Sequence, residues 1–116
     1  MKNTFLIVVA TLMLAACSHK VNLQVQTDKG TIEGIELKDG VKAYLGIPYA
    51  QAPIGDLRWK APQPKEAWRG ILPTKAFGYD PMQPVPFGDI VMRGEHIDED
   101  CLYLNVWTTA KTDKDN

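Results

Sequence analysis

Residues 99–106 read EDCLYLNV, an acidic pair that leads into an apolar stretch ending at Trp107. Along this stretch two sets of side chains alternate: Leu102, Leu104 and Val106 in one set, and Tyr103, Asn105 and Trp107 in the other. A period of two residues is typical of a β-strand. Because neither set carries a charge, we expect both faces of this strand to be covered, as in the main sheet of an α/β protein.

Two further strings precede this strand. They are GIPYA at residues 46–50 and GDLRW at residues 55–59, followed by a proline-rich stretch that reaches Trp68. In this order and spacing, the three strings resemble the type-B carboxylesterase family, the cholinesterase-like branch of the α/β-hydrolases. The resemblance covers about Val21 to Trp107 and implies the N-terminal part only of an α/β-hydrolase fold. It also implies that a full-length relative hydrolyses carboxylic esters by a Ser-His-Glu/Asp acyl-enzyme mechanism.

The catalytic groups of such an enzyme are missing from these 116 residues. An α/β-hydrolase carries its nucleophile in a G-x-S-x-G elbow, followed in the chain by an acid and a histidine. The sequence has one serine, Ser18, which lies outside any such pattern. We therefore predict a truncated family member with no catalytic residue of its own, inactive when alone. The alternative is a small periplasm-facing lipoprotein that serves as a non-catalytic binding or assembly module.

The first 17 residues have the order of a bacterial lipoprotein leader. Lys2 gives a positive start, residues 5–16 are apolar, and LAAC at residues 14–17 resembles a lipoprotein cleavage site. The apolar run is shorter than the roughly 20 residues that span a bilayer. We expect lipidation of Cys17, which makes membrane lipid a partner, and a location in the bacterial cell envelope, at the outer membrane in a diderm host. The alternative is an ordinary secretory leader with an incidental cysteine.

The sequence divides into four parts on these grounds. Residues 1–16 are a predicted signal peptide, 17–20 a lipid-anchored N-terminus, 21–110 the N-terminal portion of a carboxylesterase domain, and 111–116 a polar tail at the truncation. A content of 45% hydrophobic and 23% charged residues is typical of one globular domain. The net charge of −1 comes without a basic stripe, so we expect no nucleic-acid partner. A small-molecule ester substrate is expected only for a full-length relative.

Three charged or reactive side chains are singled out as candidate site residues. The resemblance implies a buried, structural ion pair between Arg58 and Glu99 that joins the N-terminal loops to the main sheet. The alternative is two exposed surface charges. The resemblance also implies a disulfide partner for Cys101 after Phe77, but residues 79–83 read YDPMQ. Cys101 is therefore predicted to be an unpaired, buried thiol, with a Cys17–Cys101 disulfide left open if Cys17 is not lipidated.

We expect neither a metal site nor a cofactor. His96 lies among Glu95, Asp98, Glu99 and Asp100, but a lone histidine among acids is more often solvated than metal-bound.

Alternating residues at 21–26, 31–37 and 41–46 predict an antiparallel three-stranded meander, with turns at residues 28–30 and 38–40 and an interruption at Gly34. All eight prolines lie between Pro48 and Pro86, which predicts ordered loops without regular strands. We expect the three tryptophans to pack in the core.

Overall fold

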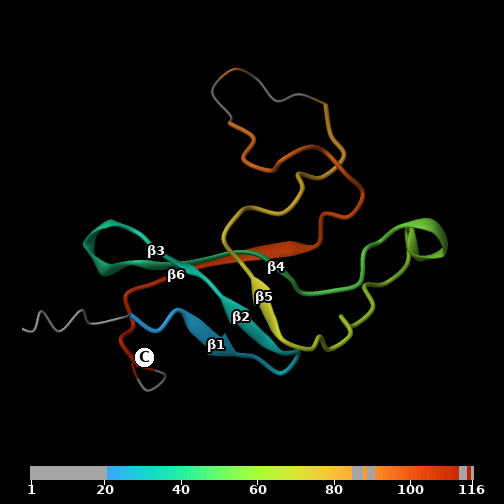
Figure 1. Ribbon diagram of the computed structural model, residues 1–116. Helices are drawn as coiled ribbons and strands as arrows, with labels where there is room; N and C mark the ends of the chain where they lie inside the picture. The colour runs from blue at the N-terminus through green and yellow to red at the C-terminus, as the bar shows by residue number, and fades with distance from the viewer. Residues whose placement is uncertain (1–20, 85–87, 89–90, 113–114, 116) are drawn as a thin grey trace, which may run out of the picture.

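The computed structural model describes residues 21–84, 88, 91–112 and 115. Within these residues the chain forms two small three-stranded sheets (Figure 1). One sheet has the order β1-β2-β5, from β1 (Gln24–Gln26), β2 (Thr31–Glu33) and β5 (Ile71–Pro73). The other has the order β3-β4-β6, from β3 (Ile35–Glu36), β4 (Lys42–Pro48) and β6 (Tyr103–Thr108). Two 3-10 turns, η1 (Lys38–Gly40) and η2 (Gly55–Leu57), lie in the connections.

The predicted meander is wrong as a single sheet, although both of its hairpins exist. β1 pairs antiparallel with β2, and β3 pairs antiparallel with β4. The predicted second strand divides at Gly34, so β2 and β3 belong to different sheets. A Cβ atom at Gly34 would overlap the carbonyl oxygen of Ala43 and the ring of Tyr44. Only glycine permits this close approach of the bent strand to β4.

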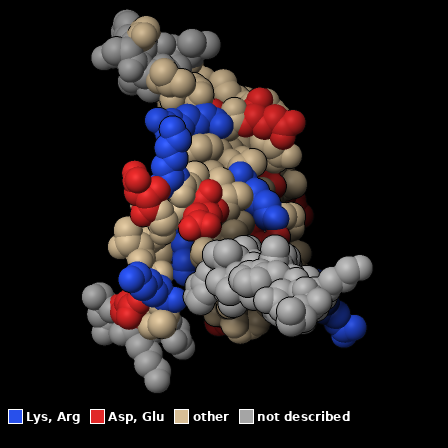
Figure 2. Space-filling view, turned by 60° about the vertical axis from the view of Figure 1, so that its left-hand side comes forward, with Lys and Arg blue, Asp and Glu red and all other residues tan. Residues whose placement is uncertain are grey.

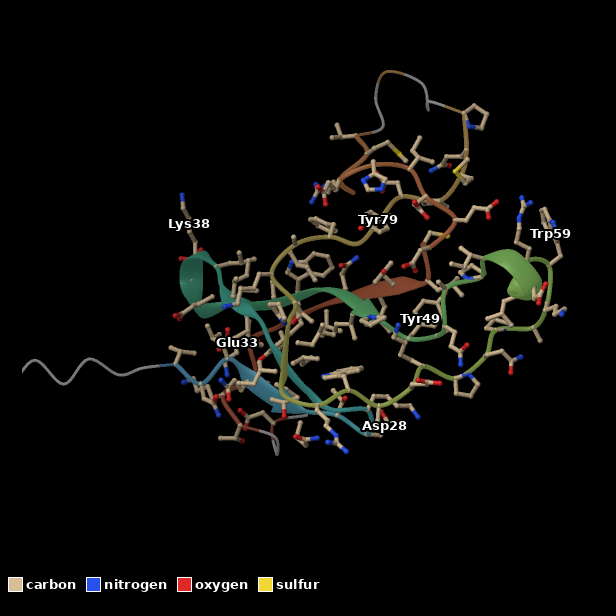
Figure 3. The ribbon with its side chains drawn as sticks, turned by 45° about the vertical axis from the view of Figure 1, so that its right-hand side comes forward. Asp28, Glu33, Lys38, Tyr49, Trp59 and Tyr79 are labelled. Atoms are coloured by element: carbon tan, nitrogen blue, oxygen red, sulfur yellow. The ribbon has the colours of Figure 1, made fainter. Side chains whose placement is uncertain are left out.

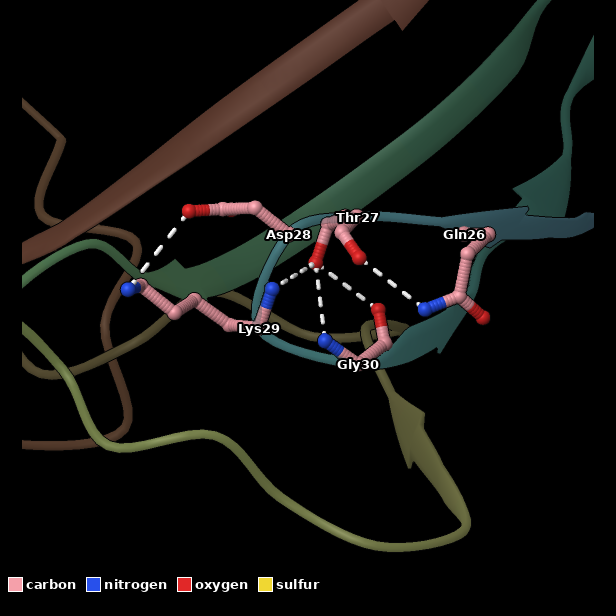
Figure 4. Close-up of polar contacts among 5 residues, drawn as sticks. All are labelled: Gln26, Thr27, Asp28, Lys29 and Gly30. Carbon is pink, nitrogen blue, oxygen red and sulfur yellow. Dashed lines mark hydrogen bonds and ion pairs between the residues drawn. The ribbon is translucent and has the colours of Figure 1, made fainter.

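The β1–β2 turn is organised by one hydroxyl group (Figure 4). Thr27 Oγ1 accepts hydrogen bonds from the N–H groups of Lys29 and Gly30, each at 3.2 Å, and donates to the Gly30 carbonyl oxygen at 2.7 Å. The Trp68 indole covers Gly30, where a Cβ atom would overlap its ring. Trp68 Nε1 donates to the Thr31 carbonyl oxygen at 2.9 Å, so the proline-rich segment is fixed to this turn.

The proline-rich segment contains one strand that the sequence analysis did not predict. β5 runs parallel to β2, with Thr31 opposite Ile71 and Glu33 opposite Pro73. Pro73 is tolerated because β5 is an edge strand, where a missing N–H costs no ladder bond. Beyond β5, the backbone N–H and the hydroxyl of the buried Thr74 both donate to the Glu33 carbonyl oxygen, at 2.8 and 3.0 Å.

The apolar core is small. Among the described residues, the buried hydrophobic side chains are Ile32, Ala43, Tyr44, Leu45 and Ala50. The prediction that the tryptophans pack in the core is wrong for Trp59, which is 94% exposed on the loop after η2 (Figure 3). Trp107 is half exposed, and Trp68 is partly buried. Trp59 lies at a turn with φ of 59°, and Figure 3 shows it at the end of the loop that is far from both sheets.

Neither face of β6 is fully covered, which contradicts the expectation of two covered faces. On one face, the rings of Phe77 and Trp107 lie 6.2 Å apart, as do those of Tyr79 and Tyr103, but Trp107 is still 50% exposed. Asn105 Oδ1 also accepts a hydrogen bond from the Gly46 N–H at 2.8 Å. The opposite face carries Leu104 and Val106, each 40% exposed. This face has too few apolar neighbours to bury it.

Candidate functional site

Arg58 and Glu99 form an ion pair that joins two distant parts of the chain. Arg58 directly follows η2, and Glu99 lies four residues before β6. Arg58 Nη2 lies 2.7 Å from Glu99 Oε1, and the two side chains are 51% and 34% exposed. The burial that was expected of this pair is therefore absent in the present structure. The pair is therefore neither the buried ion pair nor the two separate surface charges that were expected, because the charges are paired and also partly hydrated.

Cys101 is a free, partly buried cysteine. Burial raises the pKa of its thiol, and the nearby carboxylates of Asp100, Asp98 and Glu99 raise it further. The neutral thiol therefore dominates at physiological pH, and a neutral thiol is a weak nucleophile. This environment does not support covalent catalysis by Cys101.

Tyr103 and Asp100 form a contact that the sequence analysis missed. The Tyr103 hydroxyl donates to Asp100 Oδ2 at 2.9 Å. Burial, followed by this hydrogen bond and the charge of Asp100, raises the pKa of Tyr103 to about 12. In the sequence, the only sign of this contact is that Asp100 and Tyr103 are three residues apart, at the place where the chain bends before β6. The contact fixes the acidic segment against the sheet.

The remaining polar groups of this region hold a loop in place. Asp80 Oδ2 accepts a hydrogen bond from the Gly94 N–H at 2.9 Å, and the Asp80 N–H donates to the His96 carbonyl oxygen at 3.0 Å. The His96 ring stacks on Tyr79 with centroids 4.2 Å apart, and its Nε2 lies 3.7 Å from Asp98 Oδ2. In the part of the chain that the structure describes, no group of three ligands could hold a metal ion. These contacts position a loop and contain no nucleophile beside a base.

A groove of about 940 Å³ lies on the face of β6 that carries Leu104 and Val106. Its apolar wall is formed mainly by Val25, Ile32, Tyr44, Ile47, Tyr49, Trp68, Leu104 and Val106. Charged groups at its border include Asp28, Lys29, Lys42 and Lys111. On the face that Figure 2 shows, positive and negative side chains are intermingled, with no basic stripe. Among the described residues that line it, none is a serine, cysteine or histidine, so the groove shows apolar surface without a nucleophile–base pair.

The predicted lipidation site, Cys17, lies outside the described residues, as do Ser18 and the whole predicted leader. Across the residues that the structure does describe, no helix is both long and apolar enough to span a membrane.

The two small three-stranded sheets and the loops that join them have the fold expected of the N-terminal part of an α/β-hydrolase. The profile of the Carboxylesterase family matches residues 21–116. The chain belongs to this family.

Two relatives and one solved structure illustrate the match. The phenmedipham hydrolase of Pseudarthrobacter oxydans is 43% identical over 86 residues, which are 71% of this chain and 17% of the relative. The fumonisin B1 esterase of Sphingopyxis macrogoltabida is 35% identical over 111 residues, or 96% of this chain and 20% of the relative. A carboxylesterase structure from Geobacillus stearothermophilus is 39% identical with a TM-score of 0.63, over 76% of this chain and 16% of that chain. The chain therefore spans about a fifth of the length of these relatives.

Proposed function

We propose that this chain is the N-terminal scaffold of a bacterial carboxylesterase. The enzyme hydrolyses carboxylic esters through a serine acyl-enzyme whose nucleophile, base and oxyanion donors lie outside these 116 residues. The observation that carries this proposal is the match of the family profile to residues 21–116, with the three motif strings in family order. The strings fall on β4, on the loop around η2 and on β6.

The scaffold role is supported by the way in which these elements are joined. β4 and β6 pair from Lys42–Thr108 to Pro48–Tyr103 although about 60 residues separate them in the sequence. The Arg58–Glu99 ion pair connects the loop after β4 to the segment that enters β6. We propose that this pair fixes the position of the start of β6. A guanidinium group can donate two parallel hydrogen bonds to a carboxylate, so it orients the carboxylate better than an ammonium group does.

We further propose that Cys17 carries lipid and holds the protein in the bacterial cell envelope. The support is the LAAC string at residues 14–17 after a positive and then apolar leader. Intact mass spectrometry of the membrane-extracted protein tests this proposal. It should find acyl mass on the N-terminal peptide and a free thiol at Cys101. A mass that corresponds to an unmodified Cys17–Cys101 disulfide would refute both assignments.

The absence of catalytic activity in the isolated chain is tested by ester hydrolysis. The purified chain should hydrolyse short-chain p-nitrophenyl esters no faster than buffer does. The control is Ser18→Ala, which removes the only serine in the sequence. A saturable rate that persists in Ser18→Ala would show that another group in this chain is catalytic.

The binding-module alternative has no support in the comparisons, since the relatives named above are hydrolases.

A further inference from the structure

Residues 93–98, here called the strap, lie across two aromatic side chains that precede them in the chain. The guanidinium carbon of Arg93 lies 5.8 Å from the centre of the Phe77 ring. The His96 ring packs on the Tyr79 ring with centroids 4.2 Å apart. A cation over a ring face and two packed rings are both attractive contacts. The strap therefore covers this aromatic pair with two of its side chains.

Asp80 makes three hydrogen bonds to the strap. Its Oδ2 accepts from the Gly94 N–H at 2.9 Å. Its backbone N–H donates to the His96 carbonyl oxygen at 3.0 Å, and its carbonyl oxygen accepts from the Asp98 N–H at 2.9 Å. The approach is so close that a Cβ atom at Gly94 would overlap the backbone nitrogen and Cγ of Asp80. Asp80 thus holds the strap along most of its length.

The strap reaches the sheet through the aromatic pair that it covers. The rings of Phe77 and Trp107 lie 6.2 Å apart, as do those of Tyr79 and Tyr103. In the part of the chain that the structure describes, the one cysteine, Cys101, is free, so no disulfide fixes the strap. Hydrogen bonds and ring contacts hold it instead, and these can break and form again.

We propose that the strap opens and closes as one unit over Phe77 and Tyr79 while the β4–β6 pairing stays intact. β4 and β6 are joined by a ladder along the whole length of β6, whereas backbone pairing of the strap is the single bridge Asp80–Ile97. Both side chains by which the strap contacts the rings are exposed. A segment with few backbone bonds and exposed side chains opens at a lower free energy than paired strands do. The strap is therefore a reversible cover for the two rings.

Amide hydrogen exchange of the full chain tests whether the strap opens as a unit. In Asp80→Ala, the Gly94 amide loses its acceptor, whereas the Asp98 amide keeps the backbone carbonyl oxygen of residue 80. Both amides should nevertheless exchange at least about tenfold faster than in the parent. The Leu45 amide, which donates to the Thr74 carbonyl oxygen at 2.9 Å, should be unchanged. Asp80→Asn is the matched control, because it keeps an acceptor oxygen and should change the rates by less than about threefold.

A second variant leaves Asp80 intact. His96→Ala removes the ring that packs on Tyr79 and keeps the backbone carbonyl oxygen of residue 96. It should accelerate exchange of the Gly94 and Asp98 amides together, by about threefold or more. If Asp80→Ala does not fold, His96→Ala decides the question by the same comparison.

Trypsin cleavage gives an independent readout of the same opening. Arg93 lies in the strap, and Lys60 on the loop after η2 provides an exposed internal reference. In both variants, the ratio of cleavage after Arg93 to cleavage after Lys60 should rise in proportion to the exchange rates.

Three results would overturn the proposal. The first is faster exchange of the Gly94 amide alone, which would mean that each bond of the strap opens separately. The second is equal acceleration of the strap amides and the Leu45 amide, which would mean that the strap opens only when the whole chain unfolds. The third is a cleavage ratio that is the same in both variants as in the parent.

Discussion

At the scale of single residues, hydration decides how much the Arg58–Glu99 ion pair contributes to the free energy of unfolding. Removing one partner of a buried ion pair lowers the free energy of unfolding by roughly 3–5 kcal/mol. An exposed ion pair contributes about 0.2–1 kcal/mol. With side chains 51% and 34% exposed, the pair in this chain belongs near the exposed case. The motif residues and their pairing could be predicted through the family resemblance, but their exposure could not, because exposure depends on which other segments surround them.

A double-mutant cycle checks this assignment. Arg58→Met, Glu99→Gln and the double variant should give a coupling free energy of about 1 kcal/mol or less, from urea unfolding of the isolated chain. The matched control is Lys29→Met with Asp28→Asn, an exposed pair at 3.5 Å, which should couple no more strongly. A coupling free energy of 3 kcal/mol or more would show that the pair is desolvated.

Tyr103 predicts a pH dependence of stability at alkaline pH. Its pKa is about 12 in the folded chain, whereas an unfolded tyrosine titrates near 10. A pKa that is raised on folding contributes stability fully below about pH 10, and this contribution is lost as the pH rises toward 12. Tyr103→Phe should therefore flatten the fall in the free energy of unfolding between pH 10 and 12, as measured by urea unfolding. Tyr49→Phe, at a half-exposed ring, is the control. Equal pH profiles for Tyr103→Phe and the parent would contradict the assignment.

At the scale of elements, strands and turns that local patterns specify could be predicted from the sequence, whereas a strand that depends on a distant partner could not. The alternating residues of β1, β4 and β6 and the two hairpin turns could be predicted, because strand period and turn residues act over a few positions. β5 could not, because its partner β2 lies about 40 residues upstream and its own string contains Pro73. The break at Gly34 was visible, but a glycine alone does not reveal that the chain changes sheets there.

Gly34 gives the prediction at this scale. Gly34→Ala should destabilise the chain by about 1–3 kcal/mol, because its methyl group would overlap the Ala43 carbonyl oxygen and the Tyr44 ring. Gly88→Ala is the matched control, since a Cβ atom at that position meets nothing within 4 Å. Thermal unfolding followed by circular dichroism would compare the two variants. If both shift the midpoint equally, the division between β2 and β3 does not depend on the close approach at Gly34.

At the scale of the whole molecule, the described chain has little core and one large uncovered surface. Five buried hydrophobic side chains provide little apolar burial for a domain, and small sheets are marginally stable without further layers. The groove of about 940 Å³ lies on the face of β6 that carries Leu104 and Val106, and its lining includes residues of β1 and β4. No catalytic residue was predicted, because this sequence contains no G-x-S-x-G elbow around its one serine, Ser18.

Hydrogen exchange tests whether the outer edge of β6 is open in the isolated chain. In the isolated chain, the Asn105 and Trp107 amides should exchange faster than those of Leu104 and Val106, because backbone alternation directs the Leu104 and Val106 amides toward β4. Exchange measured by NMR separates the two sets. Uniform protection of the amides along β6 would mean that its second edge is covered in the isolated chain.

The central claim is that residues 21–110 are a carboxylesterase N-terminal scaffold without catalytic groups. A chimera tests it most directly, with these residues replacing the matching segment of the Geobacillus stearothermophilus carboxylesterase, which is 39% identical. The chimera should unfold cooperatively and hydrolyse p-nitrophenyl butyrate with kcat/KM within about tenfold of the parent, equivalent to about 1.4 kcal/mol in transition-state free energy. A chimera that folds cooperatively yet shows no hydrolysis would contradict the claim.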